Sequence, residues 1–135
     1  MHCEANTVGW QEKMIRVVNK RNYSGPGENI GRPSPLGNPW SHKPSKYAII
    51  LVKSTREAID KFRDWIESEP ENLPDKTPEE KELKRLLILA KKELQRLVEI
   101  YKSTKELVLI CWCVPADCHG FVIADIIHEI VRDLT

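Results

Sequence analysis

The sequence predicts an α/β domain in which helices flank a small, mostly parallel sheet of about three or more strands, in a Rossmann-like arrangement. Three short runs rich in apolar and β-branched residues, 14–19, 47–52 and 107–113, have the length and composition of strands. Two amphipathic helical patterns lie between the second and third runs, and another follows the third. Strands that alternate with helices pair in parallel through right-handed crossovers, so this order of elements predicts the fold class.

The chain has the size and composition of one domain with one core. Of its 135 residues, 41% are hydrophobic and 30% are charged. We expect residues 1–13 to form a lead-in segment and residues 14–135 to form a single α/β domain. The 21 basic and 20 acidic residues leave a net charge of +1, which argues against attraction of the whole protein to nucleic acid but allows a local basic patch.

The sequence carries no pattern of a membrane or secreted protein. No apolar run approaches the roughly 20 residues that cross a bilayer, and the N-terminal segment lacks the apolar core of a signal peptide. We therefore expect a cytoplasmic protein without membrane contact, in which the four cysteines are reduced. Such cysteines are considered first as metal ligands, nucleophiles or core residues.

The first strand, residues 14–19, leads into a polar turn and then into a segment that excludes regular structure. Residues 23–45 hold four of the six glycines and five of the nine prolines, a density that no helix or central strand tolerates. A loop this long inside a compact domain is usually functional when it is ordered. Apolar and aromatic side chains are expected to pin it to the body: Tyr23, Ile30, Leu36 and Trp40.

Local signals place three helices. After the strand predicted at 47–52, the first two helices open with capping-box sequences, Ser54–Glu57 and Thr77–Glu80. Asp117 suits the N-cap of the last helix, which follows the strand predicted at 107–113. The apolar stripes of the three helices are expected in the core: Ala58, Ile59, Phe62, Trp65 and Ile66; Leu83, Leu86, Leu87, Ala90, Leu94, Leu97, Val98 and Tyr101; Val122, Ile123, Ile126, Ile127, Ile130 and Val131.

Cysteine and histidine cluster between the third strand and the last helix. Cys111 and Cys113 lie two apart on the strand, so their side chains share one side. Cys118 and His119 fall in the first helical turn. Unpaired backbone N–H groups and the helix dipole lower the pKa of a thiol at such a place.

Three interpretations of this cluster stay open. In the first, Cys118 is a nucleophile, His119 is its acid or base partner, and Asp117 orients the histidine. In the second, zinc is held by the whole cluster: Cys111, Cys113, Cys118 and His119. The spacing of these residues departs from paired C-x-x-C knuckles, which weighs against zinc. In the third, the cysteines are core residues, an interpretation that suits Cys111 best because it lies in an apolar strand.

The second candidate site is the Gly31–Trp40 loop. Glycine lets a backbone approach a ligand closely, and N–H groups in turns form anion-binding nests. Arg32 adds a forked donor for phosphate or carboxylate, and Ser34 and Asn38 add neutral hydrogen-bonding groups. The loop matches neither the Walker A nor the G-x-G-x-x-G pattern. A rigid surface loop stiffened by proline is the alternative interpretation.

Ligands of parallel α/β sheets gather beyond the carboxyl ends of the strands. Asn19 and Arg21 follow the first strand at that end, and Cys118 follows the third. Because the Gly31–Trp40 loop comes soon after Arg21, we expect the two candidate sites to meet at one edge of the sheet. The candidate ligand-binding residues are therefore Asn19, Arg21, Arg32, Ser34, Gly37 and Asn38.

Three long motifs carry a resemblance to a known family. They are Val17–Arg21 (VVNKR), Ile30–Trp40 (IGRPSPLGNPW) and Cys111–Gly120 (CWCVPADCHG). From about Val17 onward, the chain resembles the domain of unknown function 4326 family, which is common in bacteriophage and bacterial genomes. The resemblance implies nucleotide or nucleic-acid metabolism by association alone. Its motifs coincide with the two candidate sites.

These patterns predict an enzyme or a ligand-binding domain that acts on a nucleotide-like or other phosphate-bearing molecule. The loop would bind the anion, Cys118 and His119 would supply reactive or ligating groups, and Trp40 or Trp112 would stack on a base. A zinc-stapled interaction module is one alternative. Nucleic-acid binding without catalysis is the other, through the basic residues Lys13, Arg16, Lys20, Arg21 and Arg32. The sequence leaves the substrate, the reaction and the oligomeric state open.

Overall fold

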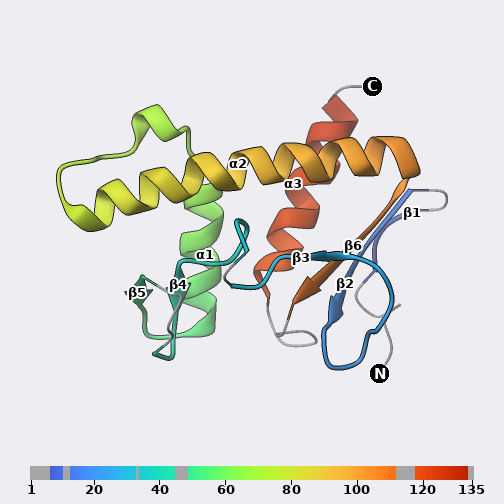
Figure 1. Cartoon of the computed structure of the whole chain (residues 1–135), viewed down its shortest axis with the longest axis horizontal. Coiled ribbons are helices and arrows are strands. Elements are labelled where there is room, and N and C mark those ends of the chain that lie inside the picture. Colours follow the sequence, from blue (N-terminus) through green and yellow to red (C-terminus); the bar gives the residue numbers. More distant parts are fainter. Residues whose placement is uncertain (1–6, 11–12, 33, 45–48, 112–117, 134–135) are drawn as a thin grey trace.

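The computed structural model describes residues 7–10, 13–32, 34–44, 49–111 and 118–133. In chain order its elements are β1 (Thr7–Trp10), β2 (Lys13–Asn19), β3 (Glu28–Asn29), β4 (Trp40–Ser41), β5 (Ile50–Leu51), α1 (Thr55–Ile66), the 3-10 turn η2 (Pro70–Asn72), α2 (Pro78–Thr104), β6 (Glu106–Cys111) and α3 (His119–Asp133) (Figure 1). None of the described helices combines the length and the apolar composition that a membrane crossing requires.

The main sheet has the strand order β1-β2-β6-β3. Strands β2, β6 and β3 run parallel and β1 pairs antiparallel with β2, so the predicted α/β class with a small parallel sheet is confirmed. Val17 of β2 is opposite Leu109 of β6, and Asn19 is opposite Cys111. The carboxyl ends of β2 and β6 therefore lie side by side. The segment expected as a lead-in, residues 1–13, contributes β1 to this sheet.

The described part of the strand predicted at residues 47–52, residues 49–52, does not join the main sheet, so its predicted place in that sheet is wrong. Within that run, β5 pairs in parallel with β4 in a separate two-stranded sheet, and Leu51 is 63% exposed instead of buried. Residues 45–48 lie outside the described residues. An apolar run indicates strand propensity but does not select the partner strand. The third parallel strand of the main sheet is instead β3, whose two polar residues carry no apolar pattern.

Capping residues begin the first two helices where the sequence predicts. Oγ of Ser54 accepts the N–H of Glu57 at 3.1 Å, although the carboxylate of Glu57 bonds the N–H of Lys53 instead of completing the box. Thr77 and Glu80 complete the second capping box. The N–H of Glu80 donates to Oγ1 of Thr77, and the N–H of Thr77 donates to the carboxylate of Glu80, each at 3.0 Å. The buried residues follow the predicted stripes: Ala58, Ile59, Phe62, Trp65 and Ile66 on α1; Leu87, Ala90, Leu94, Leu97, Val98 and Tyr101 on α2; Val122, Ile123, Ile126, Ile127 and Val131 on α3. The remaining stripe residues Leu83, Leu86 and Ile130 are partly buried.

The core lies on one face of the main sheet. Val17 of β2 and Leu109 of β6 join the buried cluster, which α2 and α3 complete. Figure 1 shows α2 crossing both α1 and α3. The other face carries Val18 and Ile110, which are buried but lie outside that cluster. The segment before β3 covers this second face, since a Cβ at Gly27 would lie 2.8 Å from Cδ1 of Ile110.

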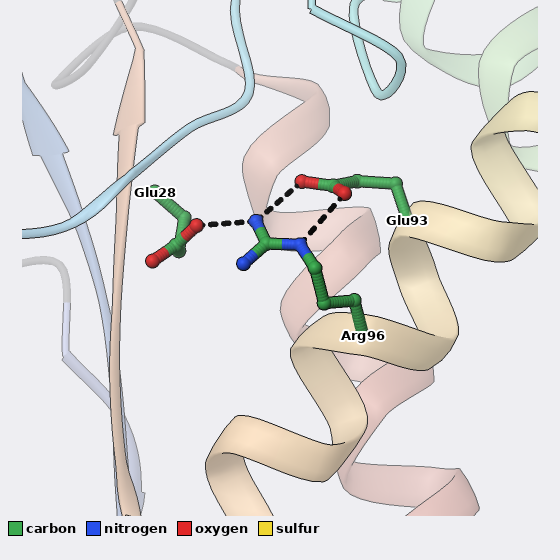
Figure 2. A network of polar contacts seen from close by, with 3 residues as sticks. All are labelled: Glu28, Glu93 and Arg96. Carbon is green, nitrogen blue, oxygen red and sulfur yellow. Dashed lines mark hydrogen bonds and ion pairs between the residues drawn. The ribbon is translucent and has the colours of Figure 1, made fainter.

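A charged cluster ties β3 to α2 just before the Gly31–Trp40 loop begins. Figure 2 shows the guanidinium of Arg96 on α2 between the carboxylates of Glu93 on α2 and Glu28 on β3. Nε and Nη2 of Arg96 donate to the two oxygens of Glu93 at 2.9 and 2.7 Å, and Nη2 also donates to Glu28. The bonds to Glu93 and Glu28 raise the pKa of Arg96, and the bond from Arg96 lowers the pKa of Glu93. Because these side chains are partly exposed, the cluster positions β3 more than it stabilises the fold.

Candidate functional site

Cys118 precedes α3 and lies against the end of β6. Its Sγ accepts the backbone N–H of Gly120 at 3.3 Å and lies 3.1 Å from Sγ of Cys111. This separation exceeds the roughly 2.05 Å of a disulfide bond, so the two residues are neighbouring thiols. Both are buried, and 3% of Cys118 is exposed. The backbone donor and the helix N-terminus both favour negative charge on the Cys118 sulfur.

His119, the first residue of α3, connects this helix to the loop. Its Nε2 lies 2.8 Å from the carbonyl oxygen of Ile30, so Nε2 carries the proton and donates it. The unprotonated Nδ1 lies 3.8 Å from Sγ of Cys118. Phe62 packs edge-to-face on the imidazole with ring centroids 5.0 Å apart. Burial lowers the pKa of His119, a shift that the Ile30 carbonyl opposes, so the ring is neutral near pH 7.

These atoms have the arrangement of a thiol–imidazole pair. The Cys118 thiol donates to Sγ of Cys111 at 3.1 Å, and Nδ1 of His119 at 3.8 Å is a second acceptor within its reach. The carbonyl of Ile30 orients the imidazole ring. The pair is enclosed, since 6% of His119 is exposed. Asp117 and Cys113, which the sequence also predicts for this site, lie outside the described residues. Among the described residues, no group of three or more His, Cys, Asp or Glu is arranged to hold a metal ion, so the zinc alternative gains no support.

The loop is held by side chains that the sequence predicts as ligand contacts. Nδ2 of Asn38 donates to the carbonyl of Ala58 on α1 at 3.0 Å, and Oδ1 accepts the N–H of Trp40 at 2.9 Å. Nη1 of Arg32 donates to the carbonyls of Asn38 and Trp40 at 3.0 and 3.1 Å. Gly37 is required sterically, because a Cβ there would lie 2.9 Å from Cα of Arg32. The amide of Asn38 and Nη1 of Arg32 thus shape the loop, and among the described residues Nε and Nη2 of Arg32 have no hydrogen-bond acceptor, so they are available to a ligand.

The loop forms one wall of a cavity of about 180 Å³, which we call the loop cavity. Four of the six predicted ligand-binding residues line it: Arg32, Ser34, Gly37 and Asn38. Trp65 of α1 and Glu82 and Leu86 of α2 also line it. The hydroxyl oxygen of Ser34 is buried and makes no hydrogen bond within the part of the chain that the structure describes. A buried hydroxyl without a partner costs free energy, so this oxygen marks a place where a ligand atom would be a partner.

The charges of the loop cavity favour an anionic ligand. Arg85 holds the carboxylate of Glu82 through two hydrogen bonds of 2.8 and 2.6 Å, which lower the pKa of Glu82. This partner offsets the negative charge of Glu82. The positively charged guanidinium of Arg32 is therefore the charged group of the loop that a bound ligand would contact.

Asn19 and Arg21 lie at the carboxyl end of β2, where Asn19 is opposite Cys111 of β6. Oδ1 of Asn19 accepts the N–H of Arg21 at 2.8 Å, and the N–H of Lys20 donates to the carbonyl of Cys111 at 2.8 Å. Neither Asn19 nor Arg21 lines the loop cavity. The structure thus joins the loop to the start of α3 through His119, and it places Asn19 and Arg21 beside the end of β6.

Sequence reasoning missed the helical lining of the loop cavity. Trp65 follows the core stripe of α1, and Glu82 follows the charged outer face of α2. No local signal distinguishes either residue from an ordinary core or surface position. They become lining residues only because α2 packs across α1 beside the loop.

The fold and the site define a small α/β domain whose glycine- and proline-rich loop covers the start of its last helix and lines a cavity. The chain belongs to the family described as a domain of unknown function (DUF4326), whose model matches residues 15–129. No curated protein and no solved structure matches the chain. Function is therefore argued from the site itself.

Proposed function

We propose that the protein binds a small phosphate-bearing, nucleotide-like molecule and holds its phosphate group in the loop cavity. One observation carries the proposal: Arg32, Ser34 and Gly37 line the same cavity, and the Ser34 hydroxyl there is buried without a described partner. A guanidinium fork and a hydroxyl are donors that recognise phosphate oxygens, whereas the N–H groups of Gly31, Ser34 and Gly37 already bond acceptors within the protein. The loop begins beside the carboxyl end of β6, where the N–H of Ile30 donates to the carbonyl of Ile110 at 2.9 Å, and many α/β domains bind ligands at that end of their strands. A closer Rossmann-like relationship, a cytoplasmic location and an association with phages stay predictions.

His119 is proposed to set the position of the loop. The imidazole donates to Ile30 directly before the loop, and a Cβ at Gly120 would lie 2.9 Å from the side chain of Ile30. The start of α3 therefore packs tightly against the first residue of the loop motif. A ligand-binding loop gains affinity when the protein holds it in its bound shape beforehand.

Pyrophosphate and ADP are suitable probes, measured by calorimetry and by thermal shift. Ser34→Ala is the sharpest variant, because it removes a buried hydroxyl without a described partner and should therefore not lower the unliganded midpoint. It should weaken both probes about tenfold, the effect of one hydrogen bond to a charged group. Arg32→Gln should weaken them further, and the exposed Arg56→Gln on α1 is the matched control. No binding by the wild type, or equal binding by Ser34→Ala and Arg56→Gln, refutes the proposal.

A thiol-dependent reaction is a second candidate, favoured by the 3.8 Å contact between Sγ of Cys118 and Nδ1 of His119, which both lie outside the lining of the loop cavity. In this reaction the neutral imidazole takes the thiol proton and the N–H of Gly120 stabilises the thiolate. Asp117 stays a predicted member of this site. Alkylation of Cys118 by iodoacetamide tests the pairing: it should slow at least severalfold in His119→Gln, and equal rates would exclude the pairing.

Nucleic-acid binding through exposed basic residues is the less favoured alternative. Lys20 and Arg21 are exposed at the end of β2, whereas the guanidinium of Arg16 lies 5.9 Å from the ring centre of Tyr23. Of these basic residues, Arg32 lines the loop cavity, and Arg16, Lys20 and Arg21 do not. Binding of this kind would weaken steeply with salt.

A further inference from the structure

A second cavity adjoins the loop cavity and shares Trp65 with it. We call it the tryptophan pocket, and its volume is about 250 Å³. Its apolar walls come from four elements or connections: Trp40, Trp65, Leu73, Pro74 and Leu83. Its polar lining residues are Lys61, Asp64, Ser68 and Glu80. Pockets for whole drug-sized ligands measure about 300–1,000 Å³, so this volume suits one ring system rather than an entire nucleotide.

The aromatic walls of the tryptophan pocket are fixed in place. Nε1 of Trp65 donates to the carbonyl of Leu83 at 3.1 Å. The rings of Trp40 and Trp65 meet edge-to-face, with centroids 5.9 Å apart and planes at 75°. The neighbouring Phe62 tilts against Trp65 with centroids 5.8 Å apart. A pocket with rigid aromatic walls receives a flat apolar ring without reorganising its own side chains.

Asp64 is the group that would select the ring. Within the described part of the chain, its carboxylate forms no hydrogen bond and no ion pair, and its backbone carbonyl accepts the hydroxyl of Ser68 at 2.7 Å. The carboxylate of Glu80 is already engaged by the N–H groups of Lys76 and Thr77. A carboxylate accepts hydrogen bonds and donates none, so Asp64 favours a ring that bears an amino group.

We propose that the tryptophan pocket binds the amino-bearing heteroaromatic base of the ligand, with its phosphate end in the loop cavity. The proposal rests on the proposed function for the phosphate end, and it names the substrate class: a nucleoside phosphate with an adenine-, cytosine- or guanine-like base. Trp65 lines both cavities, so the proposed molecule would have to pass along this side chain to occupy both. Uracil has one N3–H donor between two carbonyl acceptors, so an approach to the Asp64 carboxylate also places an acceptor against it and is disfavoured.

Nucleosides without phosphate test the base site separately from the phosphate site. Cytidine and uridine are titrated into the full chain and followed by calorimetry and tryptophan fluorescence. Cytidine should bind about threefold to fivefold more tightly than uridine, because Asp64 is exposed and water screens its hydrogen bonds. Asp64→Asn should abolish this preference, because an amide both donates and accepts. Asp60→Asn is the matched control, since Asp60 is exposed on the same helix and does not line the pocket.

The outcomes separate this inference from the proposed function. Equal binding of cytidine and uridine, no binding of either, or the same preference in Asp64→Asn and Asp60→Asn overturns the base site. Each of these results is compatible with pyrophosphate binding that depends on Ser34, which would leave the phosphate site standing. Conversely, a cytidine preference that depends on Asp64, in a protein that does not bind pyrophosphate, supports the tryptophan pocket and refutes the phosphate site.

Discussion

Replacing His119 by leucine removes the hydrogen bond that joins α3 to the loop while keeping a side chain of similar size. In the wild type, Nε2 of His119 donates to the carbonyl of Ile30 at 2.8 Å in a buried environment. His119→Leu leaves that carbonyl without its partner, which costs about 1–3 kcal/mol. It also removes the edge-to-face contact with Phe62, which contributes about 0.5–1.5 kcal/mol. We therefore expect a loss of about 2–4 kcal/mol in the free energy of unfolding.

Urea denaturation at pH 7 measures this loss. His119→Gln is the informative companion, because its side-chain amide reaches toward the position of Nε2 and restores a donor. We expect it to recover about 1 kcal/mol or more relative to His119→Leu. The exposed His42→Leu should change stability by less than about 0.5 kcal/mol. A loss below about 1 kcal/mol in His119→Leu, or equal losses in the leucine and glutamine variants, refutes the role assigned to this bond.

The pH dependence gives an independent check on His119. Burial lowers the pKa of its folded form below the ordinary value of 6.5. The unfolded chain therefore takes up the proton first as the pH falls. The stability of the wild type is fully present above about pH 6.5 and decreases below it, with a limiting slope of about 1.4 kcal/mol per pH unit. His119→Leu cannot take up this proton, so the difference in unfolding free energy between the wild type and the variant should narrow below pH 6.5. A difference that stays constant with pH would contradict the lowered pKa of His119.

Three further substitutions test the packing of the loop and the helix starts. Gly120→Ala should destabilise by about 1–3 kcal/mol in urea, because its Cβ would lie 2.8 Å from Val17 and 2.9 Å from Ile30; a gain in stability, as helix propensity alone predicts, would show that the contact relaxes freely. Asn38→Ala should cost about 2–3 kcal/mol by thermal denaturation, since two buried backbone groups lose their partner, and a neutral result would contradict its role in the loop. Thr77→Ala should cost about 1 kcal/mol, whereas Thr77→Ser should cost little; equal effects would exclude the capping bond.

The helices are predictable from the sequence because their signals are local. Thr77 and Glu80 identify a helix start within four residues, and the spacing of apolar residues then gives the buried face. The strand pairing is less predictable, because it depends on partners far away in the chain. The polar strand β3 joins the main sheet through backbone hydrogen bonds, such as the one from the N–H of Ile30 to the carbonyl of Ile110 at 2.9 Å. The more apolar run at residues 47–52 contributes only β5, outside that sheet.

The candidate site is likewise predictable where its signals are local in the sequence, and not where they depend on contacts between distant residues. Residue chemistry draws attention to Arg32, Ser34 and Asn38, but it does not reveal whether a ligand or the backbone uses each group. In the structure the side-chain amide of Asn38 forms hydrogen bonds with backbone groups, whereas the hydroxyl of Ser34 has no described partner. Trp65 and Asp64 have no signal of their own, because a core tryptophan and a surface carboxylate on a helix are ordinary. Only the packing of α1 against α2 and the loop makes them lining residues.

An amide-resolved NMR titration of the full chain with ADP tests the central claim most directly. Binding in the loop cavity predicts the largest chemical-shift changes at the amides of Ser34 and Gly37 and at the indole N–H of Trp65. Ser34→Ala should reduce these changes at equal ADP concentration. Changes confined to Lys20 and Arg21 at the end of β2, or no changes at millimolar ADP, would contradict the claim that the loop cavity is the binding site.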